Sequence, residues 1–451
     1  MRGKRNAKGR PREIPLLLPP HVRALLGDEA ESLLEALAQP PPTSIRYNPL
    51  KGTPAEGRPV PWCPQGRYLD ERPVFTMDPL FHAGAYYVQE ASSMLLGQAL
   101  RACAALPPDT VALDLCAAPG GKSTHLAALL PPEALLIANE TVPARQTILS
   151  DNLWKWGRPD VVLTQATPEA FAPMGPFCDL IVVDAPCSGE GMFRKDPHAR
   201  AQWGSNLVQT CALRQSHILD SAWPLLKPGG YLVYSTCTWE TCENEDQVRR
   251  MSEKGAEVVE LTVPPEWGVV AQGPGLRCYP HRLEGEGFFL AVLRKPGGPR
   301  EEVAGARAPA HAGSGLPEDV RGWVHRHETW AAVEKEGVLH ALSRPWGPLV
   351  EALAATVPVT SPGTPLAQRK GAAWMPHPAL ALSALCNHGA FTTLDLDAEA
   401  AIRYLRGEAL PAREAAGTAL VRHRELGLGW AQGAGNRWNN RWPTPWRIRM
   451  R

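Results

Sequence analysis

The middle of the chain alternates between two hydrophobic patterns. From about residue 86 to residue 296, short apolar runs typical of buried strands are separated by stretches with apolar residues at helical spacing. One helix is expected to begin at Pro143, where a first turn tolerates proline, and to end at Gly157. This alternation predicts an α/β fold with a mostly parallel, doubly wound sheet that carries function at the carboxyl ends of its strands. The expected strands span 111–115, 135–138, 161–164, 180–183, 231–235 and 288–293, and the other expected helices span 89–104, 126–130 and 210–226.

The chain on either side of this segment has other patterns. A helical pattern runs from His21 to Leu37, stops at prolines 40–42, and is followed by a stretch rich in proline and glycine. A later stretch, dense in proline, glycine and alanine, contains scattered helical pieces and no recognisable chemistry, and short strands with one helix at 397–405 follow it. We expect an N-terminal domain at 1–85, the α/β domain at 86–296, an intermediate region at 297–375 and a small α+β domain at 376–451.

The composition agrees with a chain of two or three globular domains. The 451 residues are 44% hydrophobic and 21% charged, which is ordinary for such proteins. No run approaches the roughly 18 apolar residues of a membrane span, so none is expected. The basic N-terminus is followed only by the short apolar segment Leu16–Leu18, which is too short for a signal peptide, and a cytoplasmic protein is predicted. The ten cysteines form neither a disulfide framework nor paired metal hooks, so we expect reduced thiols and no metal.

Positive charge is concentrated at the two ends of the chain, although the net charge is only +1. The first eleven residues contain several lysines and arginines and no acid, and no acid follows Glu425. Near the C-terminus, basic and aromatic residues alternate, a pattern that suits phosphate contact and base stacking in RNA. The alternative is a solvated tail whose tryptophans pack on their own domain. The residues concerned are Arg437, Trp438, Arg441, Trp442, Trp446, Arg447, Arg449 and Arg451.

The turn after the first strand of the α/β domain is the candidate cofactor site. Asp114 ends the strand, the pair Gly120–Gly121 permits close backbone approach, and a helix begins near Lys122. A dinucleotide fingerprint is absent, and a phosphate-binding P-loop is excluded because Cys116 stands where its first glycine belongs. The turn instead suits S-adenosylmethionine, and Glu140 at the end of the next strand can accept both ribose hydroxyls. Alternatively, Glu140 only favours the start of the next helix.

Two cysteines follow two further strands, although lone cysteines at strand ends are usually passive. Cys187 closes the sequence Asp184-Ala185-Pro186-Cys187, and Cys237 lies between Thr236 and Thr238. An aspartate in this position can bind the amino group and ring nitrogen of a base, and the thiol stands where amino-group methyltransferases usually carry a stacking aromatic residue. A thiolate that adds to C6 of cytosine makes C5 nucleophilic, so this pair beside a cofactor turn predicts cytosine-C5 methylation. The spacing alone leaves open which cysteine attacks.

Several motifs, in order, resemble those of the RNA cytosine-C5 methyltransferases (the NOL1/NOP2/Sun family) over about residues 86–296. They are 114–123, 184–192, and 235–238 with the following 243–245. The resemblance implies that Cys237 is the nucleophile, that Cys187 assists product release and that Asp184 orients the base. Lys122 then contacts the cofactor carboxylate or the target nucleotide, unless it is a surface lysine that starts a helix. The implied contacts to S-adenosylmethionine are Cys116, Ala117, Ala118, Pro119, Gly120, Gly121, Lys122, Glu140, Arg145 and Asp184.

The flanking regions extend the resemblance to the bacterial RsmF-type branch of this family, which modifies small-subunit ribosomal RNA. The implied partner is small-subunit rRNA or the assembling 30S subunit. The chain departs from the family after the third strand, where the segment around Gln165 lacks the usual aspartate near the adenine. Two alternatives stay open, namely tRNA methylation by the same chemistry and a catalytically silent ribosome-assembly protein that binds RNA. The flanking resemblance lies in 44–51, 62–66 and 83–90 and, for a PUA-like RNA-binding domain, in 387–408 and 429–447.

Overall fold

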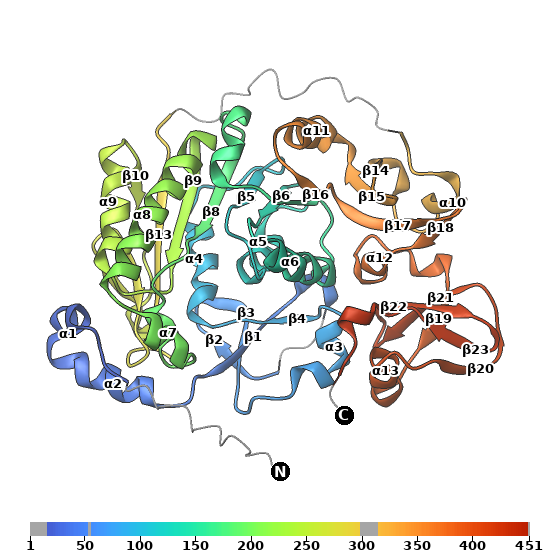
Figure 1. The fold of residues 1–451 in the computed structure, drawn as a ribbon, viewed down its shortest axis with the longest axis horizontal. Coiled ribbons are helices and arrows are strands. Elements are labelled where there is room, and N and C mark those ends of the chain that lie inside the picture. The colour runs from blue at the N-terminus through green and yellow to red at the C-terminus, as the bar shows by residue number, and fades with distance from the viewer. Residues whose placement is uncertain (1–15, 53–55, 298–313, 450–451) are drawn as a thin grey trace, which may run out of the picture.

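The computed structural model describes residues 16–52, 56–297 and 314–449, and its centre is a ten-stranded sheet (Figure 1). The strand order is β11-β12-β13-β9-β8-β5-β6-β7-β16, and β10 also pairs with β13. Strands β9, β8, β5, β6 and β7 run parallel, whereas β13 is antiparallel to β9. The centre of the sheet is parallel, as expected, but the sheet as a whole is mixed, because the five strand pairs at its two sides are antiparallel. Its strands are β5 (Val111–Asp114), β6 (Leu135–Asn139), β7 (Val161–Thr164), β8 (Cys178–Asp184), β9 (Leu226–Thr236), β10 (Glu257–Val259), β11 (Val270–Gln272), β12 (Gly275–Cys278), β13 (Phe288–Arg294) and β16 (Val359–Ser361).

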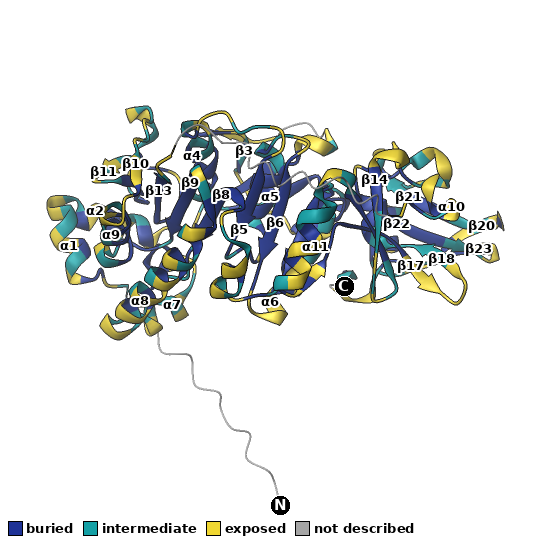
Figure 2. Ribbon diagram, turned by 90° about the horizontal axis from the view of Figure 1, so that it is seen from above, coloured by how far each residue is buried: buried dark blue, intermediate teal, exposed yellow. Residues whose placement is uncertain are grey.

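Helices cover both faces of this sheet, which explains why its strands read as continuous apolar runs. Successive residues of a strand point to opposite faces: in β8, Leu180 and Val182 pack into one core, and Ile181 and Val183 pack into the other. Figure 2 shows the buried strands between helices whose outer sides are exposed. The first face is covered by α4 (Leu96–Ala102), α5 (Gly121–Leu129) and α6 (Pro143–Trp156), and the second by α8 (Ser205–Ala222), α9 (Glu245–Glu253) and α11 (Gly347–Thr356).

The helix boundaries follow local backbone chemistry. Helix α6 begins at Pro143 and ends before Gly157, whose φ of 81° is the left-handed conformation common at helix ends, as the sequence predicted. The single helix expected over 21–37 is instead two, α1 (Pro20–Leu26) and α2 (Ala30–Ala38). Gly27, with a φ of 55°, ends the first one. The helical pattern alone did not reveal this break, because the apolar spacing continues across it.

The N-terminal sheet is attached to the central domain through a buried arginine. Arg46 is completely buried, and its guanidinium donates to Gln89 Oε1 at 2.7 Å and to Thr124 Oγ1 at 2.7 Å. It also donates to the carbonyl of Gly121 at 3.3 Å and lies 4.5 Å from the centre of the Trp156 ring. Arg46 therefore joins the N-terminal sheet to the first turn of α5. The sheet has the order β2 (Arg58–Val60), β3 (Cys63–Leu69), β1 (Thr43–Tyr47) and β4 (Tyr86–Val88), and α3 (Pro79–His82) precedes β4.

The stretch after residue 313 contains more strand than its composition suggested. It forms a four-stranded sheet, and β16 extends the central sheet by pairing antiparallel with β7. The helical pieces expected here are α10 (Glu318–Arg321), α11 and two short 3-10 helices, His327–Thr329 and Arg344–Trp346. One missed signal is Glu336-Gly337, which turns a hairpin with φ angles of 51° and 74°. The strands are β14 (Trp330–Lys335), β15 (Val338–Ser343), β17 (Thr364–Lys370) and β18 (Ala373–Pro376).

The C-terminal unit is the expected small α+β fold. Its tryptophans serve mainly as core: Trp438 and Trp442 are 6% and 2% exposed, so neither is available for base stacking. Trp446 is half-buried beneath Lys155, at 5.0 Å, whereas Arg437 and Arg441 are exposed. The basic N-terminal residues and Arg451 lie outside the described residues. The unit contains the sheet β19 (Thr392–Asp395), β21 (Thr418–His423), β22 (Leu426–Gly433), β23 (Gly435–Asn440) and β20 (Leu410–Ala415), with α12 (Pro378–Leu382) and α13 (Ala398–Leu405).

None of the helices in the described ranges is long and apolar enough to cross a membrane.

Replacing Arg46 with methionine should lower the free energy of unfolding by about 3 kcal/mol, because buried acceptors lose a charged donor. Urea denaturation followed by circular dichroism measures this loss. Arg23→Met is the control, since Arg23 is 43% exposed and pairs with Glu31 at the surface, and its effect should stay within about 0.5 kcal/mol. A similar, small effect of both substitutions would contradict the assigned role of Arg46.

Candidate active site

Strand register brings the candidate residues to one edge of the central sheet. Asp114 pairs with Val182 of β8, and Asp184 at the end of β8 pairs with Ser235 of β9. Since these strands are parallel, the segments that follow them all emerge at the same edge. The cofactor turn, Glu140 and both cysteine loops are therefore neighbours, although about 125 residues of chain separate the first from the last.

The cofactor turn is built around a buried carboxylate. Asp114 is completely buried, and its Oδ2 accepts a hydrogen bond from Ser123 Oγ at 2.7 Å. Its Oδ1 is also buried and has no hydrogen-bond partner within the described residues. Burial raises the pKa of Asp114 to about 7, and the nearby Asp184 carboxylate adds to this rise. A cationic or hydrogen-donating group of a ligand would satisfy this oxygen.

Helix α6 holds the shape of the same turn. Arg145 donates to the carbonyl oxygen of Ala118 at 2.7 Å, and Asn152 donates to that of Pro119 at 2.8 Å. Gly120 has a φ of 112°, a conformation that residues with a Cβ rarely adopt. Of the other turn residues predicted from the sequence, Ala117 is buried and Cys116 is partly exposed. The turn is thus a preformed backbone cradle at the start of α5.

Glu140 lies beside this cradle and is only 3% exposed. Its Oε1 accepts a hydrogen bond from the backbone N–H of Val142 at 2.9 Å, at the start of α6. Its Oε2 pairs with Arg145 at 3.2 Å. The alternative reading of Glu140, as a residue that favours the helix start, therefore describes one oxygen, while the other faces the arginine that holds the turn.

Lys122 connects the cofactor turn to the first cysteine loop. Its Nζ lies 2.7 Å from Asp184 Oδ2, and the side chain is only 12% exposed, so it is not a surface lysine. Asp184 Oδ1 accepts a hydrogen bond from Ser235 Oγ at 2.8 Å. The ammonium group also lies 5.0 Å from the centre of the Phe288 ring. Asp184 is thus oriented by Lys122 from the cofactor turn and by Ser235 from β9.

The two cysteines meet. The Sγ atoms of Cys187 and Cys237 are 3.0 Å apart, and the backbone N–H of Cys237 donates to Cys187 Sγ at 3.3 Å. The contact with Cys237, together with burial, raises the pKa of the Cys187 thiol well above its usual range. Cys187 therefore keeps its proton and can donate it in a hydrogen bond to Cys237. The raised pKa disfavours a thiolate on Cys187.

Asn139 is a site residue that the sequence reasoning missed. It is completely buried, and its Oδ1 accepts from Thr164 Oγ1 at 2.9 Å and from the N–H of Ala166 at 3.0 Å. Its amide donates to the carbonyl oxygens of Leu115 and Ala166. It thereby fixes the ends of β5, β6 and β7 together. A polar residue that closes an apolar strand directly before Glu140 was the available signal.

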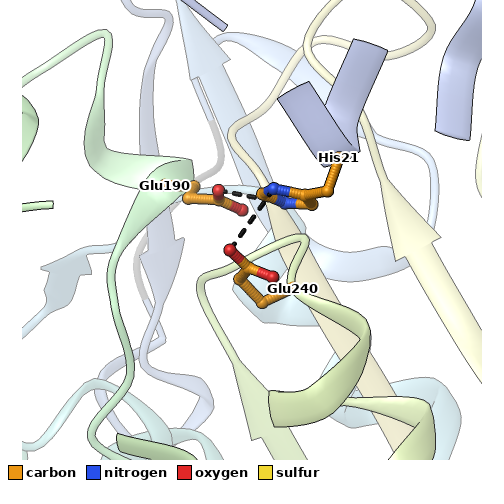
Figure 3. A group of neighbouring side chains, drawn as sticks. All are labelled: His21, Glu190 and Glu240. Carbon is orange, nitrogen blue, oxygen red and sulfur yellow. Dashed lines mark ion pairs between the residues drawn. The ribbon is translucent and has the colours of Figure 1, made fainter. Parts of the chain in front are cut away.

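A histidine from the N-terminal helices reaches the cysteine loops (Figure 3). His21 Nε2 lies 3.1 Å from Glu190 Oε1, and its Nδ1 lies 3.3 Å from Glu240 Oε1. Burial disfavours the imidazolium, but the two carboxylates outweigh it and raise the pKa of His21. Burial and the repulsion from Glu190 raise the pKa of Glu240 to about 7. The three groups offer ligand-type atoms within 4.8 Å of one another, so the absence of a metal stays a prediction.

The doubly wound sheet and the acid-lined turn at its carboxyl edge are typical of an S-adenosylmethionine-dependent methyltransferase, and the match of residues 103–294 to a methyltransferase family confirms the predicted cofactor. A methyltransferase homolog protein from Pyrococcus horikoshii has 28% identity and a TM-score of 0.51 over 60% of this chain and 91% of its own. NSun6 from Pyrococcus horikoshii with SFG has 23% identity and a TM-score of 0.54 over 64% and 99%. The second likeness shows the fold alone.

Family comparisons are more specific. The model for 16S rRNA methyltransferase RsmB/F matches residues 103–294, that for the N-terminal domain of RsmF matches 18–91, and that for the RsmF PUA domain matches 391–448. Ribosomal RNA small subunit methyltransferase F from Escherichia coli is 32% identical over 92% of each chain. Its counterpart from Erwinia tasmaniensis is 32% identical over 85% of this chain and 84% of its own. The chain belongs to the RsmB/F family of 16S rRNA methyltransferases, as the sequence predicted.

The buried Asp114 carboxylate should make stability depend on pH. The pKa of Asp114 is raised from 3.8 to about 7 in the folded protein, which therefore binds the proton more tightly than the unfolded chain. This contribution to the free energy of unfolding falls as pH rises from about 4 to 7. Asp114→Asn should remove it, so that wild type loses stability relative to the variant between pH 4 and pH 8. Urea unfolding of both proteins in the absence of cofactor measures the difference, and a constant difference across that range would contradict the assignment.

Proposed function

We propose that this chain methylates C5 of cytosine in 16S rRNA through a covalent adduct between Cys237 and C6 of the base. One observation carries the proposal: two thiols lie 3.0 Å apart at the carboxyl edge of the sheet, beside Asp184 and the cofactor turn. Methylation of an exocyclic amino group needs no thiol, whereas C5 of cytosine becomes nucleophilic only after addition at C6. A silent RNA-binding protein would have no need for this arrangement.

The cofactor assignment rests on how the edge residues suit S-adenosylmethionine, which supplies the methyl group when it is bound. Asp114 presents a buried acceptor without a partner among the described residues, which suits the amino group of the methionine part. Glu140 would accept the ribose hydroxyls, and Arg145 would orient it. The backbone of 116–121 would surround the methionine end. Lys122 would hold Asp184 in place on the side of the target nucleotide.

The protein groups have distinct roles in the covalent step. The Cys237 thiolate forms a bond to C6, and the electron pair of the C5–C6 double bond becomes available at C5 for methylation. A base then removes the C5 proton, the double bond forms again and Cys237 leaves as a thiolate. The Asp184 carboxylate would accept a hydrogen bond from the exocyclic amino group of the cytosine. Cys187, which keeps its proton, would donate to the departing Cys237 sulfur and so assist release.

The distinction between the cysteines has two supports. The family resemblance assigns the attack to Cys237 and product release to Cys187. Independently, the contact with Cys237 and burial raise the pKa of the Cys187 thiol well above its usual range, which makes Cys187 poorly suited to attack as a thiolate. The choice that strand position alone had left open is thus supported by the contact between the two sulfurs.

The substrate proposal rests on the relatives and on the flanking domains. The relatives named above are ribosomal RNA small subunit methyltransferases F, which favours 16S rRNA, free or in an assembling 30S subunit in the cytoplasm, over tRNA. A cleft between the N-terminal sheet and the loop after Glu190 is lined by Arg72, Arg194, Lys195 and one acid, Glu90. The side chain of Arg194 is buried against Glu286, whereas Arg72 and Lys195 are exposed cations that suit a phosphate backbone.

The two cysteines should differ when each is removed. Cys187→Ala should accumulate a covalent complex with RNA that resists denaturing electrophoresis, because release loses its proton donor. Cys237→Ala should give neither complex nor 5-methylcytosine. Incubation with S-adenosylmethionine and naked 16S rRNA or 30S subunits tests both variants. Methylation by Cys237→Ala would show that the nucleophile is assigned wrongly.

The modified RNA can be identified in cells. Deletion of the gene should remove 5-methylcytosine from at least one position of 16S rRNA and leave the tRNAs unchanged, because the relatives act on the small subunit. Bisulfite sequencing of total rRNA and tRNA measures both. Loss of methylation in tRNA alone would favour the alternative substrate.

A further inference from the structure

Two buried glutamates connect the loops that carry the cysteines by hydrogen bonds. The loop after β8 contains Cys187 and Glu190, and the loop after β9 contains Cys237 and Glu243. Each glutamate accepts hydrogen bonds from the loop to which it does not belong. Both side chains are completely buried, a costly position for a carboxylate unless hydrogen bonds compensate.

Glu190 holds the backbone that follows Cys237. Its Oε2 accepts from the N–H of Trp239 at 2.8 Å and from Thr238 Oγ1 at 3.1 Å. The N–H of the next residue, Gly191, donates to the carbonyl oxygen of Cys237 at 2.8 Å. A Cβ at position 191 would lie 2.9 Å from that carbonyl oxygen and 2.3 Å from the oxygen of Gly287, so this approach requires glycine. The Cys237 backbone is thus held on the side of the Cys187 loop.

Glu243 holds the backbone around Cys187 in the reciprocal manner. Its Oε2 accepts from the N–H of Ser188 at 3.0 Å and from Gln215 Nε2 at 2.7 Å. Gln215, on α8, also donates to the carbonyl oxygen of Pro186 at 3.0 Å. Both chain neighbours of Cys187 are therefore fixed by Glu243 and its partner. A hydrogen bond of 2.8 Å between the hydroxyls of Ser188 and Thr238 lies between the two carboxylates.

We propose that Glu190 and Glu243 are positioning residues that set the separation of the two thiols. For the covalent step this inference rests on the proposed function, whereas the separation itself can be measured without RNA. Neither carboxylate acts on the base; each acts through the loop that it holds. Attack by Cys237 and proton donation by Cys187 require neighbouring sulfurs, and a misplacement of about 1 Å can cost about a hundredfold in rate.

The N-terminal helices contact Glu190 through the ion pair of His21 that Figure 3 shows. His21, on α1, lies against the Glu190 oxygen that does not hold the Cys237 loop. The ring of Trp203, just after α7 (Pro197–Gln202), stacks on His21 with 6.1 Å between centroids. Glu240 and, more remotely, Arg277 are the other charged groups that act on this histidine. Helix α1 therefore touches a residue that positions the nucleophile.

The thiol separation can be measured with phenylarsine oxide. One arsenic atom forms bonds to two neighbouring sulfurs, and its oxygen leaves as water with the two thiol protons. The wild-type protein should bind one arsenical through Cys187 and Cys237. It should retain this arsenical in a large excess of a monothiol and release it when a dithiol is added. Intact-protein mass spectrometry detects the product, and Cys187→Ser and Cys237→Ser identify the signal that belongs to this pair among the ten cysteines.

The variants separate the hydrogen-bond acceptor from the charge. Glu243→Met and Glu190→Met remove the acceptors at similar volume and should weaken arsenical binding about tenfold or more. Glu243→Gln and Glu190→Gln keep one carbonyl oxygen and should restore most of it. Gln215→Met, which removes the hydrogen bonds from α8 to Glu243 and to the carbonyl oxygen of Pro186 but leaves the carboxylate in place, is a milder variant should the methionine variants not fold. Glu253→Met, an exposed glutamate on α9, is the matched control and should bind as wild type does.

Kinetics then test the covalent step. In the methionine variants the rate of adduct formation with RNA should fall about tenfold or more, while the KM for RNA and the Kd for S-adenosylmethionine change less than about twofold. Undiminished arsenical binding in the methionine variants would overturn the proposal, as would equal losses in the methionine and glutamine variants. A parallel loss of cofactor affinity would also overturn it, since the effect would then be general. A wild-type protein that binds the arsenical but forms no RNA adduct would refute the proposed function alone.

Discussion

The parallel pairing of β8 with β9 is the constraint on which the site depends. Asp184 lies opposite Ser235 in the register of these strands, and the cysteines follow three and two residues later. A shift of one residue would turn the side chains of one strand to the other face of the sheet. The register is held by apolar residues that alternate between two cores, so packing far from the thiols determines that they meet.

The charged side chains at the carboxyl edge of the central sheet form small networks of ion pairs rather than standing alone. Lys122 joins Asp184, Arg145 joins Glu140 to the cofactor turn, and His21 joins Glu190 to Glu240. Each link connects two segments far apart in the sequence. Since a charge in a poorly solvated site is costly without a partner, such links make the segments fold together. The same reasoning applies to Arg46, which connects the N-terminal sheet to α5.

Much of the α/β domain and of its site was predictable because periodicity and turn chemistry agree there. The strand expected at 161–164 and the helix between Pro143 and Gly157 have the predicted bounds. The cofactor turn, Glu140 and both cysteines lie at strand ends, as buried apolar runs indicated. The stretch after residue 313 was predictable only in part, because its short strands are separated by glycine turns and complete a sheet begun elsewhere. The C-terminal tryptophans illustrate the same limit, since Trp438 and Trp442 are core residues of a unit whose packing the local pattern does not contain.

The class of fold, the family and the chemical groups at the strand ends could be predicted from the chain alone, because they depend on local periodicity and on ordered motifs. Which of these groups touch depends on the tertiary structure. The 3.0 Å contact between Cys187 and Cys237 and the crossed hydrogen bonds of Glu190 and Glu243 arise between residues about 50 apart in the chain. The raised pKa of the Cys187 thiol follows from that contact and from burial. No spacing within either loop contains this information, since it depends on the distance between the loops.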